Sequence, residues 1–315
     1  MQSDKQGIII KSTGKWYLVQ TTEGEKIYCS LKGKFRIKGI KSTNPLAVGD
    51  NVVFQMQDED TGVIKQIKPR SNYIIRKSTK LSSQAHIIAA NIDQGLIIAT
   101  VSYPRTSTGF IDRFLVSAAA YHIPVKIVFN KSDIYTEAEK AQLAELSNAY
   151  QSIGYETIIT SAKTGYGLKQ FKNLLDQKRS VIVGHSGVGK SALLNALVPG
   201  INLRIGDLSH IHRKGKHTTT FAEMHEIWKN TYVIDTPGIK ELGLIDLEKQ
   251  ELRLFFPEML KITDQCRFHN CTHVHEPGCA VKNAVENGKI YRFRYQNYLN
   301  MLQGNEMNLN PWEQK

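Results

Sequence analysis

One stretch constrains the fold of this 315-residue chain more than any other, Gly184-His185-Ser186-Gly187-Val188-Gly189-Lys190-Ser191. It matches the pattern G-x-x-x-x-G-K-[ST], follows the short apolar run Ser180–Val183 and leads into helical spacing from Ala192 onward. A strand, a glycine-rich turn and a helix N-terminus in this order point backbone N–H groups at one small volume, and glycine lets phosphate oxygens approach closely. We therefore predict a phosphate-binding loop through Ala192, in which Lys190 reaches the β- and γ-phosphates and the Ser191 hydroxyl binds Mg²⁺.

A second motif, Asn130-Lys131-Ser132-Asp133, indicates which base accompanies the phosphates. The Asp133 carboxylate can accept hydrogen bonds from both the ring N–H and the exocyclic amine of guanine, a pair of donors that adenine lacks on that edge. We expect the asparagine to tie the loop together and the lysine stem to cover the base. Ser161-Ala162-Lys163 could present the Ala162 N–H to the guanine carbonyl. The motifs together predict guanine-nucleotide binding.

A further motif, Asp235-Thr236-Pro237-Gly238, follows the apolar run Tyr232–Ile234 and has the pattern D-x-x-G. We expect Asp235 to hold Mg²⁺ through water and the Gly238 N–H to contact the γ-phosphate. Many GTPases place glutamine directly after this motif to orient the attacking water, whereas this chain has Ile239. An apolar side chain cannot position water, so we expect intrinsic hydrolysis to be slow.

The polar, basic segment between these motifs, residues 206–220, is typical of a switch loop that γ-phosphate and Mg²⁺ would order. A basic loop without fixed structure fits the same composition. One threonine should complete the magnesium shell. Thr220 is nearest to the following strand and is our assignment, and Thr219 is nearly as well placed.

The pattern of apolar residues predicts two architectures within one chain. Strands and helices alternate from about residue 85 to residue 235, which indicates a parallel, doubly wound α/β sheet with ligands at the carboxyl ends of its strands. The first 70 residues instead contain five short strands, which suggest a small β-barrel, and the oligonucleotide-binding (OB) barrel is one such fold. Pro69–Lys80 is predicted to be a basic linker. We therefore divide the chain into a barrel (1–70), a GTPase domain (71–245) and a helical module (246–315).

Three of the four cysteines gather near the C-terminus, in the spacing C-x4-C-x-H-x5-C formed by Cys266, Cys271, His273 and Cys279. In a cytosolic chain such clustering suggests metal binding rather than disulfides. Three thiolates and one imidazole complete a tetrahedral zinc shell with no open position, so we expect one structural Zn²⁺. On spacing alone, His269 and His275 compete for the fourth position, and three buried free thiols are the simpler alternative.

The net charge of +12 and the pI near 9.4 favour a polyanionic partner. In the barrel, a loop with five cations around Phe35 suits a phosphate backbone and a stacked base, although a solvated loop fits equally well. Helical stretches are expected at residues 247–256 and 282–301. The cations Arg267, Lys289, Arg292 and Arg294, among aromatic residues, could face RNA or form the solvated rim of a packed helix. With no run of about 18 apolar residues and no apolar leader, we expect no membrane contact and a cytoplasmic location.

The order of the motifs is unusual. They resemble those of translation-factor-like GTPases, in which the phosphate loop comes first and the guanine motifs last. Here Asn130–Asp133 and Ser161–Lys163 precede Gly184–Ser191 and Asp235–Gly238, so the order is circularly permuted. A fold tolerates this because domain termini usually lie close together on the surface. The γ-phosphate motif then leads, through Leu242 to Leu254, directly into the C-terminal module.

Together with the Cys-Arg-Phe…Cys-x-His…Glu-Pro-Gly-Cys pattern, this permutation makes nearly the whole chain similar to the ribosome-small-subunit-dependent GTPases, the RsgA/YjeQ family. The resemblance implies that His273 is the fourth zinc ligand and that His217, in the switch loop, takes over the catalytic role of the missing glutamine. It also implies a slow GTP hydrolase that binds the small ribosomal subunit and its rRNA, is stimulated by it, and acts in late subunit maturation. We expect a monomer. The alternative is a GTP-gated RNA-binding or scaffold protein in which turnover is incidental.

Overall fold

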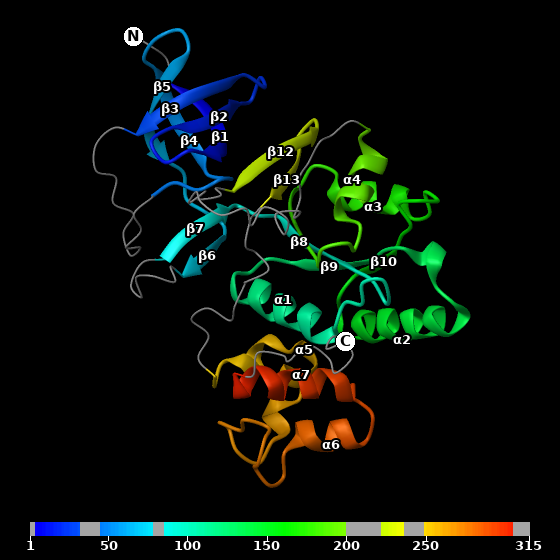
Figure 1. Cartoon of the computed structure of the whole chain (residues 1–315). Helices are drawn as coiled ribbons and strands as arrows, with labels where there is room; N and C mark the ends of the chain where they lie inside the picture. The colour runs from blue at the N-terminus through cyan, green and yellow to red at the C-terminus, as the bar shows by residue number, and fades with distance from the viewer. Residues whose placement is uncertain (1–3, 32–44, 78–84, 200–221, 236–248, 305–315) are drawn as a thin grey trace, which may run out of the picture.

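The computed structural model describes residues 4–31, 45–77, 85–199, 222–235 and 249–304, which form a barrel, a central sheet covered by helices, and a small C-terminal module (Figure 1). The lysine-rich barrel loop around Phe35 lies outside these residues. In the part of the chain that the structure describes, no helix is long and apolar enough to cross a membrane.

The predicted barrel is confirmed, and its strand order is that of a closed five-stranded sheet. Its strands are β1 (Lys5–Ser12), β2 (Tyr17–Thr21), β3 (Lys26–Leu31), β4 (Asn51–Met56) and β5 (Thr61–Ile67). They pair in the order β1-β2-β3-β5-β4, β4 returns to β1, and only β3 and β5 run parallel. Alternate residues such as Val19, Phe54 and Ile64 fill the interior and are fully buried, as the two-residue period of a strand requires.

The predicted linker is wrong in part. Residues 73–77, inside the segment expected to be a linker, form strand β6 (Tyr73–Lys77), which pairs antiparallel with β7 (Ala85–Ala90). The basic, proline-containing flanks obscured a short β-branched run, and pairing with a strand further along the chain decided its structure. Ile74 of this ribbon is buried in the core of the GTPase domain.

The central sheet confirms the doubly wound prediction. Its strands are β8 (Gln94–Ala99), β9 (Val125–Phe129), β10 (Thr157–Ile159), β11 (Arg179–Val183), β12 (Glu223–Trp228) and β13 (Thr231–Asp235). They lie in the order β10-β9-β8-β11-β13-β12, all parallel except β12. At its edge, β12 meets barrel strand β1 through the pair Lys11 and Glu223.

Helices cover both faces of this sheet. They are α1 (Thr108–Ala120), α2 (Glu137–Ile153), α3 (Leu168–Leu175) and α4 (Lys190–Leu197). In β8, Ile97 packs into the core that contains α1 and α2, whereas its neighbours Leu96 and Ile98 pack with α3 and α4. Helix α1 begins three residues earlier than the expected 111, because the Ser107 hydroxyl caps the N–H of Phe110 at 3.2 Å.

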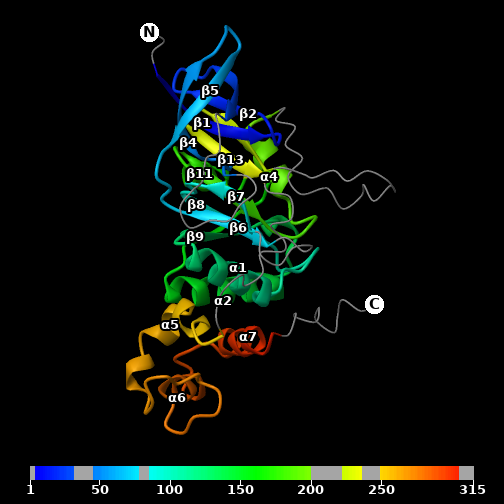
Figure 2. The same ribbon diagram turned by 90° about the vertical axis from the view of Figure 1, so that its left-hand side faces the viewer.

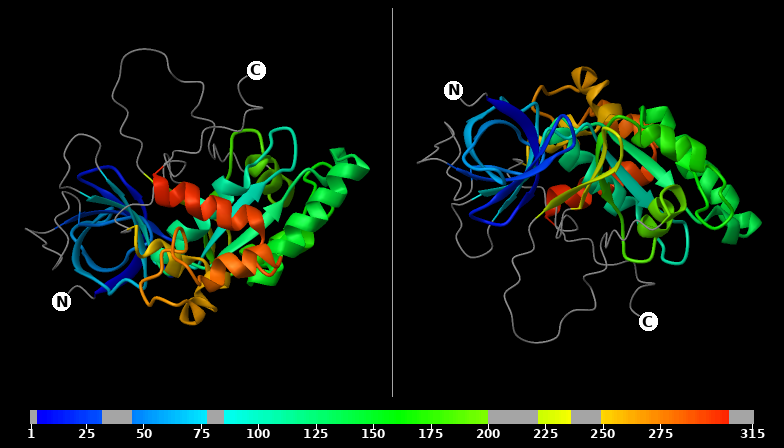
Figure 3. Two further views of the ribbon diagram at one scale, coloured as in Figure 1. Left: turned by 90° about the horizontal axis from the view of Figure 1, so that it is seen from below. Right: turned by 90° about the horizontal axis from the view of Figure 1, so that it is seen from above.

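The C-terminal module lies against α1 and α2, on the side of the molecule away from the barrel (Figures 1 and 2). It contains the 3₁₀ turns η4 (Leu252–Phe255) and η5 (Thr263–Gln265) and the helices α5 (Pro257–Leu260), α6 (Ala280–Glu286) and α7 (Arg292–Gln303). The expected helix at 282–301 is therefore two helices, because the chain turns at Gly288, whose φ is 70°. Seen from below, α7 extends across the GTPase domain (Figure 3).

Candidate functional site

The phosphate loop has the predicted context, between the end of β11 and the first turn of α4. Two of its glycines are required by geometry. A Cβ on Gly184 would lie 2.4 Å from the carbonyl oxygen of Ile98, and one on Gly189 would lie 2.3 Å from Nδ2 of Asn130. Both residues also have positive φ, 153° and 96°. Any side chain at either position would therefore displace the loop from its neighbours.

Lys190 lies across the mouth of the loop. Its ammonium donates to the carbonyl oxygens of Gly184 and His185, both at 2.9 Å, and the residue is only 7 % exposed. The loop thus holds one nearly buried cation where phosphate oxygens would arrive. Ser191 follows in the first turn of α4, half-buried, at the position that a magnesium ligand requires.

Asn130 joins three of the predicted motifs. Its Nδ2 donates to the carbonyl oxygen of Val188 in the phosphate loop at 2.9 Å. Its Oδ1 accepts from the Thr160 hydroxyl at 3.2 Å and from the N–H of Ala162 at 3.3 Å. The side chain is 1 % exposed, so each of these bonds is shielded from water. One amide therefore fixes both guanine motifs against the phosphate loop.

Asp133 is oriented by the other guanine motif. Its Oδ1 accepts a hydrogen bond from the Ser161 hydroxyl at 2.6 Å, and that hydroxyl accepts from the N–H of Thr164 at 3.1 Å. Lys131 adopts the left-handed conformation (φ 65°) and donates to the carbonyl oxygen of Tyr103 at 2.5 Å. Lys163 is exposed beside them. The arrangement leaves the Asp133 carboxylate exposed next to Ser161, and such a carboxylate can accept from two base donors.

Several predicted residues fall outside the described part of the chain. They are Thr219, Thr220, His217, Gly238 and Ile239. Asp235 is the last residue of β13, and β13 lies parallel to β11. The carboxyl ends of parallel strands share one edge of a sheet. Asp235 therefore lies at the same edge of the sheet as the phosphate loop.

The second candidate site is a cluster of Cys266, Cys271, His273 and Cys279, whose ligand atoms all lie within 4.8 Å of one another. His273 Nδ1 lies 3.7 Å from the Cys266 sulfur and 3.4 Å from the Cys279 sulfur. A tetrahedral zinc with ordinary bond lengths would separate sulfur and nitrogen by about 3.6 Å. The cluster can therefore hold a metal ion, and His269 and His275, both exposed, are not part of it.

The buried thiols of the cluster would ionise only with a cation beside them. Burial raises the pKa of Cys271 to about 12 and also raises the pKa of Cys279, so both thiols would stay protonated unless a cation compensates the thiolate charge. A divalent ion supplies that charge and is bound by the deprotonated ligands. The donor set of three sulfurs and one imidazole suits zinc best among common biological cations.

The chain matches two models of one protein family. A family model described as RsgA GTPase matches residues 67–245, and one described as RsgA N-terminal domain matches residues 6–64. This chain belongs to the RsgA family.

Curated relatives cover nearly the whole chain. It is 52 % identical over 301 residues to small ribosomal subunit biogenesis GTPase RsgA 2 of Bacteroides thetaiotaomicron, covering 96 % of this chain and 97 % of that protein. It is 49 % identical over 306 residues to the RsgA GTPase of Christiangramia forsetii, with the same two coverages. Among solved structures, YjeQ from Thermotoga maritima matches with a TM-score of 0.80, 38 % identity and coverage of 96 % and 98 %. YloQ, described as a circularly permuted GTPase, matches with a TM-score of 0.75, 30 % identity and coverage of 96 % and 95 %.

The structure of this RsgA-family chain also reveals residues that sequence reasoning missed. The Tyr135 hydroxyl donates to the carbonyl oxygen of Asn130 at 2.5 Å and accepts from the N–H of Val101 at 3.0 Å. Burial raises the pKa of Tyr135 to about 12, so it remains a donor at physiological pH. In the sequence, nothing marks a tyrosine two residues after the Asn130–Asp133 motif as part of the site. Only the tertiary structure shows that Tyr135 supports the loop formed by this motif.

The metal cluster has a similar supporting layer. The Tyr295 hydroxyl donates to the carbonyl oxygen of His273, and the Tyr298 hydroxyl to that of Thr272, both at 2.6 Å. The Glu276 carboxylate accepts bonds from the Thr272 hydroxyl and from three backbone N–H groups of the same loop. Desolvation alone would raise the pKa of Glu276, but these hydrogen bonds lower it to about 2. Hydrogen bonds from the α7 tyrosines and to Glu276 within the loop therefore both fix the loop that carries His273.

The prediction of an RNA-facing surface is wrong for Arg294, which does not face solvent. Arg294 is fully buried and forms ion pairs with Asp112 at 2.5 Å and with Glu258 at 2.7 Å. Lys289 and Arg292 are exposed, so the alternative of a packed helix with a solvated rim describes α7 better. Sequence could not separate these readings, because arginine serves equally in buried ion pairs and on RNA-binding surfaces.

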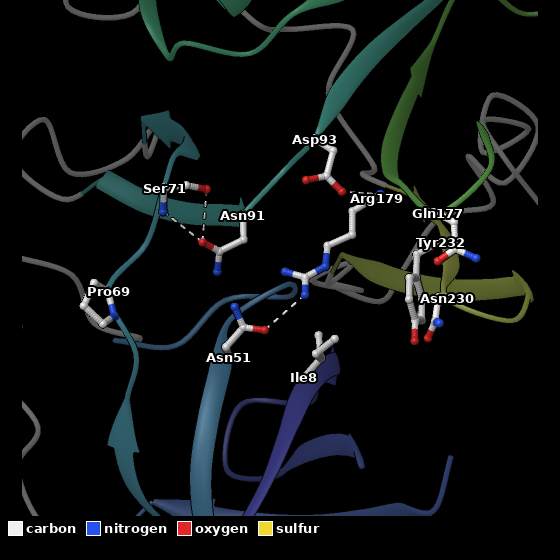
Figure 4. Close-up of a pocket in the computed structure, with 10 residues that line it drawn as sticks. All are labelled: Ile8, Asn51, Pro69, Ser71, Asn91, Asp93, Gln177, Arg179, Asn230 and Tyr232. Atoms are coloured by element: carbon white, nitrogen blue, oxygen red, sulfur yellow. Dashed lines mark hydrogen bonds between the residues drawn. The ribbon is translucent and has the colours of Figure 1, made fainter. Parts of the chain in front are cut away.

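A polar cavity of about 470 Å³ lies where the barrel meets the amino ends of the central strands (Figure 4). Arg179, the first residue of β11, crosses this junction and donates to the carbonyl oxygen of Gly49 at 3.3 Å and to Asn51 Oδ1 at 3.1 Å. Asn91 accepts from the N–H of Ser71 at 2.9 Å and donates to the carbonyl oxygen of Gly49 at 3.0 Å. These bonds attach the barrel at the edge opposite the phosphate loop.

Proposed function

We propose that this protein binds GTP between the motifs at 130–133, 161–163 and 184–192 and hydrolyses it on the small ribosomal subunit during late maturation. The observation that carries the proposal is the position of Asn130, which bonds to the phosphate loop and to the second guanine motif at once. A pocket that fixes these motifs together suits a guanine nucleotide, and the names of the relatives supply the ribosomal role.

In this proposal each group around the nucleotide has one task. Lys190 transfers its hydrogen bonds from loop carbonyls to the β- and γ-phosphates. Mg²⁺, bound by Ser191 and Thr220 and held through water by Asp235, would neutralise phosphate charge. The Asp133 carboxylate, already aligned by Ser161, reads the guanine donors.

Hydrolysis is proposed to be slow in the free protein. Ile239 occupies the position where many GTPases orient the attacking water, and its side chain has no group that can hold a water molecule. We assign that role to His217, which would be placed when the small subunit orders the switch segment. Binding of the subunit would then raise the turnover number rather than only the affinity for GTP.

The Cys/His cluster is proposed to hold one structural Zn²⁺. Three thiolates and His273 Nδ1 would fill a tetrahedral shell, leaving no position for water or substrate. The metal would cross-link the segment before α6 to the loop that Tyr295 and Tyr298 support from α7. Its contribution is folding free energy for a module too small to fold on its own core.

The charge of the chain suggests the chemical nature of its partner. The net charge of +12 suits rRNA, which the barrel and the metal module would contact on either side of the nucleotide. We propose domains at residues 1–70, 71–245 and 246–315, acting as a cytoplasmic monomer without membrane contact.

The decisive experiment measures GTP hydrolysis by the purified protein alone, with small ribosomal subunits, and with large subunits as the control. We expect small subunits to raise the turnover number and large subunits to leave it unchanged. Binding that depends on GTP with an unchanged turnover number would instead favour a GTP-gated scaffold, and failure to bind guanine nucleotides would contradict both readings.

A further inference from the structure

Helix α1 belongs to two cores at once. Ile111, Phe114 and Leu115 pack into the core of the GTPase domain. Val116 is fully buried in the core of the C-terminal module, a cluster that also contains Leu252. In Figure 1 the helix lies between the central sheet and α7. A shift of α1 relative to either partner would therefore open packed apolar surface.

The face toward the module carries a set of buried charges. Asp112 Oδ1 accepts from Arg294 at 2.5 Å and from the Tyr150 hydroxyl at 2.9 Å, while Oδ2 accepts from Asn297 at 2.6 Å. Arg294 also donates twice to Glu258, at 2.7 and 3.2 Å. Asp112 and Arg294 are 0 % exposed. Because an unpaired buried charge is very costly, this contact is made as a whole or lost as a whole.

Burial alone would lower the pKa of Arg294, but the carboxylates of Asp112 and Glu258 raise it above its ordinary value. The guanidinium therefore stays charged. The stacking of this guanidinium over Phe256, 4.6 Å from the ring centroid, fixes the charge within the module. The ion pair therefore holds the module in one position on α1.

The first turn of α1 reaches the nucleotide pocket. The Phe110 ring packs on the ring of His185, the second residue of the phosphate loop, with centroids 4.2 Å apart. Only two residues earlier, the Thr108 hydroxyl oxygen accepts a bond from Asn297 of α7 at 3.2 Å. The His185 carbonyl in turn accepts from Lys190. A continuous series of contacts thus runs from the phosphate loop, through one helical turn, to the module.

We propose that α1 couples nucleotide binding to docking of the metal module, with Asp112, Arg294 and Phe110 as positioning residues. A nucleotide that fixes the loop around His185 stabilises the position of α1 to which Arg294 binds, and docking of the module raises nucleotide affinity by the same factor. This route is separate from the chain segment that follows β13. The inference rests on the proposed guanine-nucleotide site.

The test is a double-mutant cycle in the full-length zinc-loaded protein, with fluorescent GDP binding as the measurement. Arg294→Met keeps the side-chain length and removes the charge, and Phe110→Leu removes the ring contact with His185. We expect R294M to weaken GDP binding about fivefold or more, and to have no further effect when F110L is present. Arg292→Met, on the exposed side of the same helix, is the control and should bind GDP like the natural protein.

Hydrogen exchange provides a second readout, and its first part, the effect of GDP on the natural protein, does not depend on the stability of a variant. We expect GDP to slow exchange of the α7 amides, and this protection to vanish in F110L. Equal weakening by R294M in both backgrounds, or α7 amides indifferent to GDP, would overturn the coupling while leaving the proposed function intact. A protein that binds no GDP at all would instead overturn the proposed function.

Discussion

Single side chains decide how the guanine pocket is built. Asn130 and Ser161 act through hydrogen bonds to other residues of the proposed guanine site, whereas Asp133 is the residue proposed to read the base. Asn130 and Ser161 are buried, whereas Asp133 is exposed. In the proposed site, the preference for guanine therefore depends on one carboxylate that accepts two hydrogen bonds from the base.

Asp133→Asn tests that dependence. An asparagine amide cannot accept both guanine donors, and the loss of charge-assisted bonds should cost about 3 kcal/mol, or roughly 100-fold in GDP affinity. The new amide donor can instead bond to the extra carbonyl of xanthine, so affinity for the xanthine nucleotide should rise. Titrations with both nucleotides measure the change, and an unaltered preference for guanine would contradict the assigned role.

Tyr135→Phe tests the residue beneath the guanine loop. Removing the hydroxyl leaves the Val101 N–H and the Asn130 carbonyl without this partner, so the free energy of unfolding should fall by about 1–3 kcal/mol. GDP binding should also weaken, because Asn130 loses its support. Chemical denaturation with and without GDP provides both values. The exposed Tyr28→Phe, in the barrel, is the control and should alter neither.

At the scale of elements, the phosphate loop and the metal loop are both held by contacts from outside themselves. Asn130 occupies the space above Gly189, and α7 tyrosines bond to the carbonyls of the metal loop. Neither loop has regular structure to fix it. Changes in these contacts should therefore affect the loops before they affect the sheet.

Gly189→Ala should abolish tight nucleotide binding while the sheet remains folded. The added methyl group would overlap the Asn130 amide, and φ is 96° at this residue. Gly154→Ala is a matched control, since φ is 114° there and the structure places nothing within 4 Å of the new Cβ. The control should lose only about 1 kcal/mol of stability. Nucleotide titration and thermal unfolding distinguish the two; equal GDP affinity in both variants would refute the steric argument.

Removal of the metal should open the C-terminal module. With zinc bound we expect the three cluster thiols to be unreactive, and after chelation they should react with a thiol reagent. Cys29, buried in the barrel, is an internal control and should stay protected. Thiol titration before and after chelation counts them. Three thiols that stay unreactive without metal would favour the simpler reading of buried free cysteines.

At the scale of the whole molecule, the barrel and the module attach to the GTPase domain at different places. The barrel joins the amino ends of the strands through Arg179, and the module joins α1 through Arg294. The phosphate loop, where we propose that the nucleotide binds, lies at the opposite edge from the barrel contact. The module contact, unlike the barrel contact, therefore has a short route to the phosphate loop.

Arg179→Met should loosen the barrel without weakening GDP binding. The variant loses the bonds to Gly49 and Asn51, whereas the strand itself keeps its ladder to β8 and β13. We expect faster proteolysis of the connection at residues 68–72 and an unchanged affinity for GDP. Lys229→Met, in the exposed turn before β13, is the comparison. A protease-resistant R179M protein would show that the remaining contacts, the sheet edge at β1 and the Asn91 bond to Gly49, are enough to fix the barrel.

The sequence by itself determined the permuted sheet, the barrel and the spacing of both sites, because backbone requirements at Gly184 or Cys266 are local and leave a readable pattern. It did not determine the fate of Arg294 or Tyr135, nor that residues 73–77 form a strand. Those outcomes depend on partners that lie elsewhere in the chain, such as Asp112, Val101 and strand β7. Only the tertiary structure brings such groups within hydrogen-bonding distance, and burial then fixes whether a charge meets solvent or a counterion.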